Sequence, residues 1–246
     1  MYDPVKDGVD KTVDSVSHSE ARPPEALRGL VHSFWELKTE RPLASDLVLH
    51  AVPDACVNIL FNQLDTDIAG ITALRTTYEA LNLGREFHYV GIQLLPGAWQ
   101  GNQNETTDKF VGTPYTGDLP LAETSRQMAG LEFSGKQALL AALAHTLIDA
   151  GIVSANVVTE KVLPNIDRIQ TVSDMAEMTH LSSRQLQRKL KQLTGFSPHN
   201  LLKVLRLQQS FKHHYLETYA DQSHFIHSFR KITGYTPAQY YRKFNV

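Results

Sequence analysis

The sequence predicts an α+β chain with two domains: a β-rich, barrel-like N-terminal domain that includes helices, and an all-α C-terminal domain. Three observations predict this fold class. Short runs of β-branched and aromatic residues, separated by Pro, Gly, Asn and Asp, fill much of the first half. One helical pattern occurs twice near the C-terminus, with an offset of 39 residues. The net charge also changes sign between the two parts of the chain.

We expect residues 1–22 to be poorly ordered, because they are polar and contain no apolar segment. Residues 23–155 are expected to form the N-terminal domain. Its first part, to about Gly117, contains runs such as LVHSFWEL, ACVNILFN and FHYVGIQLLPGAW. Such runs are typical of the strands of a barrel or sandwich.

The end of this domain, from about 119 to 152, is expected to be helical. Gly130 and Gly135 should separate a helix that begins near Pro120 from a second helix with an apolar stripe. This stripe either pairs with a second copy of the chain or packs on its own barrel. Residues 156–164 are expected to be a linker. The stripe consists of Leu139, Leu140, Leu143, Leu147 and Ile148.

Residues 165–246 are the basic C-terminal block. They contain 12 Lys and Arg against 5 Asp and Glu, a charge of +7, whereas the preceding residues carry −9. A basic block suits a polyanion. The lone Cys56 excludes an intramolecular disulfide and fits a reducing cytoplasm. The most apolar window, 138–153, is too short to cross a bilayer, so we expect a cytoplasmic protein without a membrane partner.

The repeated pattern covers residues 182–198 and 221–237. In each copy, apolar residues at i, i+4 and i+7 predict a short helix with one buried face. A Gly then ends the helix, and a Ser/Thr-Pro pair begins the next one. The apolar residues are Leu186, Leu190 and Leu193 in the first copy, and Phe225, Phe229 and Ile232 in the second.

Capping patterns predict where the helices of the first copy begin. Thr171 with Asp174, and Ser182 with Gln185, each combine an N-cap residue with a partner three residues later. Pro198 suits the first turn of a long connecting helix. The helix after Ser182 has a polar face whose Arg and Gln side chains suit base edges in a major groove. An ordinary solvated face would explain one such helix, but two in tandem predict a reader of neighbouring grooves. The polar residues are Ser183, Arg184, Gln187, Arg188 and Lys191.

The block from about Ile169 to Phe244 resembles the DNA-binding domain of the AraC/XylS family of transcriptional regulators. The matching stretches are VSDMAEMTHLSSRQLQRKLKQLTGFSP and DQSHFIHSFRKITGYTPAQYYRK. The resemblance implies two helix-turn-helix units joined by a long helix, with recognition helices at 182–193 and 221–232 in successive major-groove segments. Double-stranded DNA is the implied partner, and RNA polymerase is a candidate one. The further DNA contacts implied are Gln222, Ser223, His224, His227, Arg230, Lys231, Arg242 and Lys243.

The sequence departs from the family pattern in three places. His180 replaces the turn glycine of the first unit, and His227 stands where Arg is frequent. Between Arg206 and Asp221 roughly ten residues are missing, about three helical turns. Either the second unit is truncated, or a disordered segment is absent from the sequence. We favour the second alternative and predict a chain break or disorder at about 213–219.

The N-terminal part resembles, more loosely, a sensor-like domain of some AraC-type regulators. The cues are FW, VPDACVNILF, VGIQLLPGAW and GDLPLAE, in that order. This resemblance implies a small-molecule effector or a homodimer, and no cofactor. Trp35, Phe87 and Trp99, with Phe34 and Tyr78, are candidates to line an effector pocket. Core aromatic residues are the alternative interpretation.

Two other classes of protein are alternatives to a regulator. A barrel enzyme would need a metal, and His32, His50 and His88 come with no H-x-H pair, no H-E-x-x-H and no clustered carboxylates. Catalytic motifs such as G-x-S-x-G or a P-loop are also absent, so we expect no enzyme and no metal site. A non-DNA-binding interaction protein with a degenerate second unit is the other alternative. The prediction is a sequence-specific transcriptional regulator.

Overall fold

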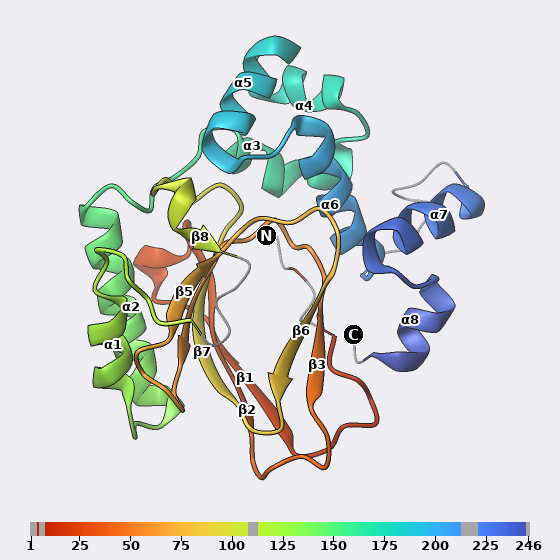
Figure 1. Ribbon diagram of the computed structural model, residues 1–246. Helices are drawn as coiled ribbons and strands as arrows, with labels where there is room; N and C mark the ends of the chain where they lie inside the picture. Colours follow the sequence, from red (N-terminus) through yellow and green to blue (C-terminus); the bar gives the residue numbers. More distant parts are fainter. Residues whose placement is uncertain (1–3, 5–7, 108–112, 213–220, 245–246) are drawn as a thin grey trace.

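The computed structural model describes residues 4, 8–107, 113–212 and 221–244. A β-rich N-terminal part is followed by a helical C-terminal part, which confirms the predicted fold class (Figure 1). The strands are β1 (Val16–Ala21), β2 (Val31–Thr39), β3 (Leu47–Ala51), β4 (Asn58–Asn62), β5 (Ala69–Thr72), β6 (Glu79–Gly84), β7 (His88–Leu94) and β8 (Thr106–Thr107).

The helices follow in chain order, with short 3-10 turns η1 (Glu25–Leu27) and η2 (Gln103–Glu105) among the strands. They are α1 (Leu121–Met128), α2 (Phe133–Asp149), α3 (Thr159–Val162), η3 (Leu163–Arg168), α4 (Val172–Thr179), α5 (Ser183–Thr194), α6 (Pro198–Ser210), α7 (Gln222–Thr233) and α8 (Pro237–Lys243). No helix in the described residues is long and apolar enough to cross a membrane.

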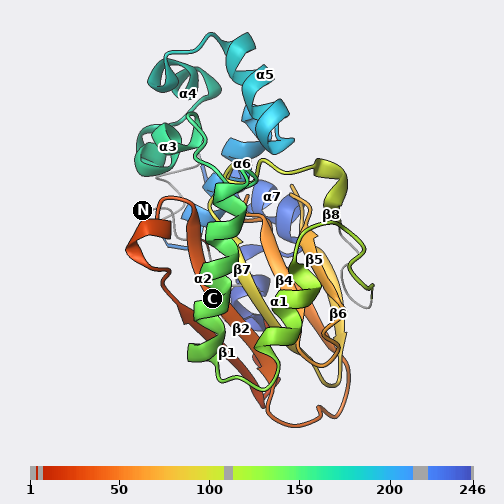
Figure 2. The same cartoon turned by 90° about the vertical axis from the view of Figure 1, so that its left-hand side faces the viewer.

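Two sheets make up the N-terminal part. Six strands pair in the order β1-β2-β7-β4-β5-β8, and all these pairs are antiparallel except β5 with β8. Strands β3 and β6 form a separate two-stranded antiparallel sheet. The two sheets lie opposite each other, and helices α1 and α2 cover the outer face of the larger sheet (Figures 1 and 2).

Alternation along β2 shows how the strands divide their side chains. Phe34 packs in the core shared with α1 and α2, and Glu36 meets α2, whereas Trp35 faces the space between the sheets. Strands β4 and β7 alternate in the same way, with Ile59 and Ile92 on the helix side. The apolar stripe of α2 therefore packs on the chain's own sheet, through Leu140, Leu143 and Leu147.

A buried ionic cluster joins α2 to this sheet. The Nζ of Lys136 donates to the Oε1 of Glu36 at 2.6 Å, and the Nε2 of His88 lies 2.9 Å from the same oxygen. Burial alone would raise the pKa of Glu36, but hydrogen bonds from Lys136 and His88 outweigh it and hold this pKa below its usual value. Burial lowers the pKa of His88, against the pull of Glu36. The cluster therefore favours the ionised carboxylate of Glu36 and disfavours the protonated form of His88.

Three expectations about boundaries were wrong. Residues 16–21 are not disordered, because they form β1, which pairs with β2 along its whole length: Val16 lies opposite Thr39, and Ala21 lies opposite Phe34. The polar residues of β1 suit the exposed edge of a sheet. Gly135 does not break α2. A glycine inside a helix costs only about 1 kcal/mol relative to alanine, and the buried leucine face of α2 outweighs this cost. Residues 156–164 are not an extended linker: α3 lies there, and Val158 and Val162 are buried in the core of the first helical pair.

The first helices of the C-terminal part begin at the positions that the capping patterns in the sequence predicted. Thr171 and Ser182 each form a capping box, with Asp174 and Gln185. Helix α6 begins at Pro198, as predicted, after the N-cap Ser197. The described residues from 171 to 243 contain five α-helices and no strand, in agreement with the predicted all-α domain. The chain break or disorder predicted at 213–219 lies outside the described residues.

Candidate functional site

Helix α5 presents the predicted polar face to solvent. Its apolar face is fully buried through Leu186 and Leu190, which fixes how the helix is rotated about its axis. Lys191 is placed at the end of the helix, where its Nζ donates to the carbonyl oxygen of Gly195 at 3.0 Å. The predicted contact residues Ser183, Arg184, Gln187, Arg188 and Lys191 are all exposed.

Helix α7 repeats this arrangement in the second unit. Phe225, Phe229 and Ile232 are buried, and the Asp221 side chain accepts a hydrogen bond from the backbone N–H of His224 at 2.7 Å. The helix therefore has a carboxylate N-cap in place of the Ser of α5. Gln222, Ser223, His224, His227, Arg230 and Lys231 are exposed.

Helices α5 and α7 end alike. Gly195 and Gly234 are left-handed C-caps, with φ of 72° and 78°. The next helix starts after an N-cap Ser197 or Thr236 and a proline. His180 takes the left-handed conformation at φ 56°, so histidine adopts the backbone of the glycine it replaces. The sequence repeat is thus a structural repeat.

Arg242 and Lys243, the last two of the predicted DNA contacts, differ in their surroundings. Arg242 is exposed. Lys243 is exposed too, but its Nζ donates to the hydroxyl of Tyr235 at 3.2 Å and lies 5.2 Å from that ring centroid. A phosphate at Lys243 would have to compete with these contacts.

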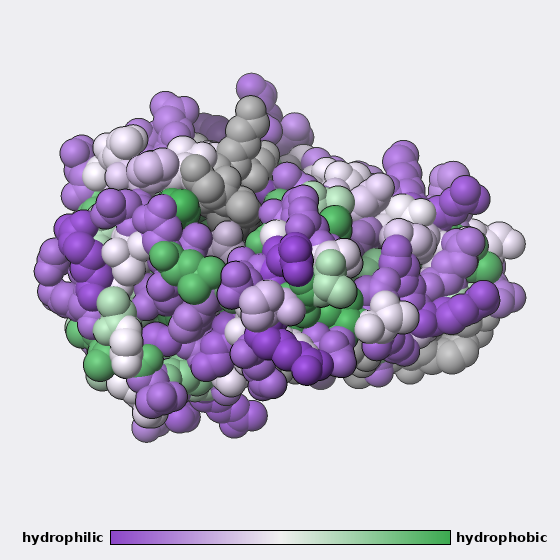
Figure 3. Space-filling view, turned by 60° about the horizontal axis from the view of Figure 1, so that its bottom comes forward, coloured by the Kyte–Doolittle hydropathy of each residue, from purple (hydrophilic) through white to green (hydrophobic). Residues whose placement is uncertain are grey.

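On the face shown in Figure 3, hydrophilic residues predominate and the coloured apolar residues occur in small groups.

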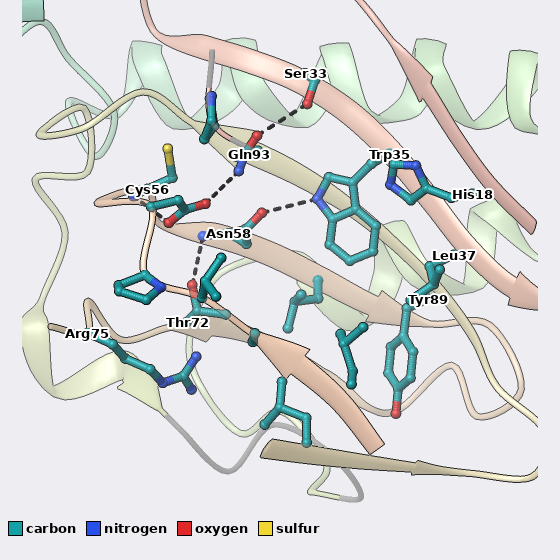
Figure 4. A pocket seen from close by; sticks show the side chains of 18 of the residues that line it. His18, Ser33, Trp35, Leu37, Cys56, Asn58, Thr72, Arg75, Tyr89 and Gln93 are labelled. Atoms are coloured by element: carbon teal, nitrogen blue, oxygen red, sulfur yellow. Dashed lines mark hydrogen bonds between the residues drawn. The ribbon is translucent and has the colours of Figure 1, made fainter. Parts of the chain in front are cut away.

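A cavity of about 140 Å³ lies between the two sheets of the N-terminal part. In volume it is close to a cavity of ~150 Å³ that holds a benzene-sized molecule. Its two ends differ in their lining (Figure 4). Asn58, Thr72, Arg75 and Gln93 gather at one end, and Leu37, Tyr89 and His18 lie at the other. An amphipathic small molecule matches this division.

Hydrogen bonds organise the polar end of the cavity. The Nε1 of Trp35 donates to the Oδ1 of Asn58 at 3.1 Å, and the Nε2 of Gln93 donates to the Oδ2 of Asp54 at 2.7 Å. Burial raises the pKa of Asp54, and the hydrogen bonds from Cys56 and Gln93 offset only part of this effect. A protonated Asp54 would add a donor beside the acceptor oxygens at this end.

Of the five candidate pocket residues, Trp35 lines this cavity, whereas Phe34, Tyr78, Phe87 and Trp99 do not. The indole of Trp35 lies against Gly91 on the neighbouring strand, where a Cβ would come within 2.4 Å of the ring. Phe87 is buried among Leu37, Leu49 and Tyr89, which line the cavity, but does not line it itself. Trp99 is buried in the core shared with α1 and α2. Asn58 and Gln93 were not predicted from the sequence. Their signal was a polar residue within each apolar strand, VNILF and GIQLL.

The three histidines considered for a metal lie apart. His88 joins the Glu36 and Lys136 pair, and the Nδ1 of His32 lies 2.8 Å from the Oε1 of Gln93. His50 sits among aromatic rings at the boundary with α7 and α8. Within the described parts of the chain, no group of three His, Cys, Asp or Glu is placed to hold a metal ion.

His50 is the centre of the contact between the N-terminal domain and the second unit. Its ring stacks on Tyr78 and Phe244, with centroids 4.5 and 4.8 Å away. Tyr235 and Tyr240 approach at 5.3 and 5.7 Å. Leu49 and Ala51, its neighbours on β3, line the cavity on the opposite face. The two-stranded sheet therefore separates the cavity from the second unit.

Stability should fall as the pH falls through the range of His50. Burial lowers the pKa of His50 below 6.5, and Lys243 lowers it further, against a hydrogen bond with the Thr233 backbone. The unfolded chain therefore binds this proton at higher pH than the folded one. The stabilisation is complete above about pH 6.5 and declines below it.

The measurement is the thermal midpoint between about pH 7 and 5, in the range where histidine titrates. In the His50→Phe variant, the thermal midpoint should depend less on pH. The dependence that remains is expected to come from His88. His145, which is exposed on α2, provides the control His145→Asn. An unchanged pH dependence in His50→Phe would contradict the prediction.

Comparisons with known proteins give three findings. A family model described as a domain of unknown function, DUF6597, matches residues 19–113. No curated protein matches the chain. Among solved structures, ToxT from Vibrio cholerae matches with a TM-score of 0.42 and 10% sequence identity, covering 92% of this chain and 98% of that one. At that TM-score and identity, the likeness carries no argument about function.

Proposed function

We propose that this protein is a sequence-specific DNA-binding transcriptional regulator of the AraC/XylS type. The observation that carries the proposal is the structural repeat: α5 and α7 have the same left-handed glycine C-cap, buried faces of the same spacing, and polar outer faces. The charge of +7 on residues 165–246 supports a polyanionic partner. Two such helices in one chain fit two neighbouring major-groove segments.

The exposed residues divide into two roles. Side chains in the first turns of each helix are suited to base edges: Arg to guanine, Gln to adenine. Arg230, Lys231, Arg242 and Lys243 lie at helix ends, where contacts to phosphates are expected to position the protein without reading sequence. The base-edge set is Ser183, Arg184, Gln187 and Arg188 on α5, and Gln222, Ser223, His224 and His227 on α7.

The cavity supports a second part of the proposal, control by a small-molecule effector. It lies between the two sheets, with polar side chains gathered at one end and Trp35 among its walls. Asn58 accepts from Trp35, and its backbone N–H donates to the Oγ1 of Thr72 at 2.8 Å, so the polar end is held in place before a ligand arrives.

Salt dependence tests the function and separates it from a protein-interaction module. Binding to duplex DNA should weaken by orders of magnitude between about 50 and 200 mM salt, because bound phosphates release counterions. The ratio of affinities for a selected site and a scrambled duplex should stay high at both concentrations. If the protein does not bind duplex DNA at low salt, the proposal is wrong and the alternative, a non-DNA-binding interaction protein, is favoured.

Arg242→Ala should weaken binding to the selected site and the scrambled duplex about equally. We expect the slope of log K against log salt to become shallower by about 1, the contribution of one phosphate contact. Titrations of both duplexes at several salt concentrations check this. A loss confined to the selected site would assign Arg242 to base recognition instead.

A further inference from the structure

The C-terminal end of α7, the recognition helix of the second unit, packs against the N-terminal domain. The last carbonyl groups of a helix have no partner inside the helix. At the end of α7, the backbone N–H of Tyr78 donates to the carbonyl oxygen of Ile232 at 2.8 Å. The ring of Tyr78 also covers Gly234. The ring of His50 stacks on Tyr78 and lies 5.3 Å from the ring of Tyr235, centroid to centroid. The end of α7 and the residues just after it therefore contact His50 of β3 and Tyr78, the residue before β6.

Apolar side chains also join the second unit to the N-terminal domain. The core of the second unit includes Val52 of the N-terminal domain beside Phe225, Phe229 and Tyr240. Farther along, the backbone N–H of Lys11 donates to the carbonyl oxygen of Lys243 at 2.9 Å. At the matching glycine of the first unit, Gly195, a Cβ would meet open space. The two glycine caps thus have the same backbone but different surroundings.

We propose that Tyr78 and His50 are positioning residues for the second recognition helix, so that the N-terminal domain sets the orientation in which α7 meets DNA. The inference rests on the proposed function for its DNA consequence. Neither residue need touch DNA. They act by holding the C-terminal end of α7, while Gln222 to His227 remain exposed at its other end.

Distances between spin labels test the positioning without DNA. Labels on Gln127 in α1 and His227 in α7 report on the second unit, and labels on Gln127 and Gln192 in α5 report on the first; all three residues are exposed. Buried Cys56 is replaced by Ala. Tyr78→Ala should broaden only the 127–227 distance distribution, and Tyr78→Phe, which keeps the ring, should leave both unchanged. A 127–227 distribution as narrow as that of the parent protein, or equal broadening of both pairs, would overturn the proposal.

The two glycine caps provide a second test if Tyr78→Ala does not fold. Ala at either position adopts the same left-handed φ, so the backbone strain is matched. Only at Gly234 would the new Cβ meet Tyr78, 2.7 Å from its Cε1. Gly234→Ala should therefore broaden the 127–227 distribution, whereas Gly195→Ala should leave it unchanged. Equal behaviour of the two variants would refute a role for Tyr78.

Binding to DNA gives the functional readout. In the Tyr78→Ala variant, discrimination against a site with its second half scrambled should fall from roughly tenfold or more to near none. Discrimination at the first half should be retained, which a general loss of folding would not allow. If the parent protein binds no DNA, the proposed function fails, while the label distances still decide the positioning.

Discussion

Replacing Lys136 with methionine is expected to lower the free energy of unfolding by about 3–5 kcal/mol, the cost of leaving a buried charge without its partner. Glu36 is 3% exposed and Lys136 2%, and they are joined at 2.6 Å. Methionine keeps much of the side-chain volume of lysine, so the loss reports on the charge rather than on a cavity. Urea unfolding followed by circular dichroism measures it.

Lys38 is the matched control, because it faces the other carboxylate oxygen of Glu36 at 3.5 Å but is 38% exposed. Lys38→Met should cost no more than about 1 kcal/mol, as exposed ion pairs do. Adding Glu36→Leu to Lys136→Met should recover part of the loss, since the buried carboxylate, left with only His88 and the exposed Lys38, is then gone. Similar small losses for Lys136→Met and Lys38→Met would show that the pair contributes little.

Substitution of Arg188 by alanine is expected to cost about 1–3 kcal/mol of binding free energy on the selected DNA site and to relax discrimination at one or two base pairs. Arg188 lies one turn into α5, exposed, with Arg184 and Gln187 on the same face. A guanidinium there can donate two hydrogen bonds to one guanine, and alanine can donate none. Binding titrations on selected and scrambled duplexes measure both effects.

Arg22, an exposed arginine of the N-terminal domain, controls for the loss of one positive charge. Arg22→Ala should leave the ratio of the two affinities unchanged. Arg188→Lys keeps the charge but not the planar pair of donors, so it should recover affinity for both duplexes more than discrimination. If Arg188→Ala leaves discrimination intact, the recognition face on α5 is misassigned, although the helix-turn-helix fold could stand.

The sequence by itself determined the helical C-terminal part closely. Caps and apolar spacing are local signals, so Thr171, Ser182 and Pro198 marked helix starts that the structure confirms. Period-two patterns likewise predicted a β-rich first half. The same local signals failed for β1, because its polar residues form a strand only through pairing with β2.

Only the tertiary structure decided which polar groups meet. Glu36, His88 and Lys136 come from two strands and a helix far apart in sequence, and no local pattern links them. Trp35 faces a cavity while Phe87 and Trp99 fill cores, a difference set by how the two sheets oppose each other. The contact of His50 and Tyr78 with the end of α7 depends on how one domain packs against the other, and spacing along a chain carries no information about that.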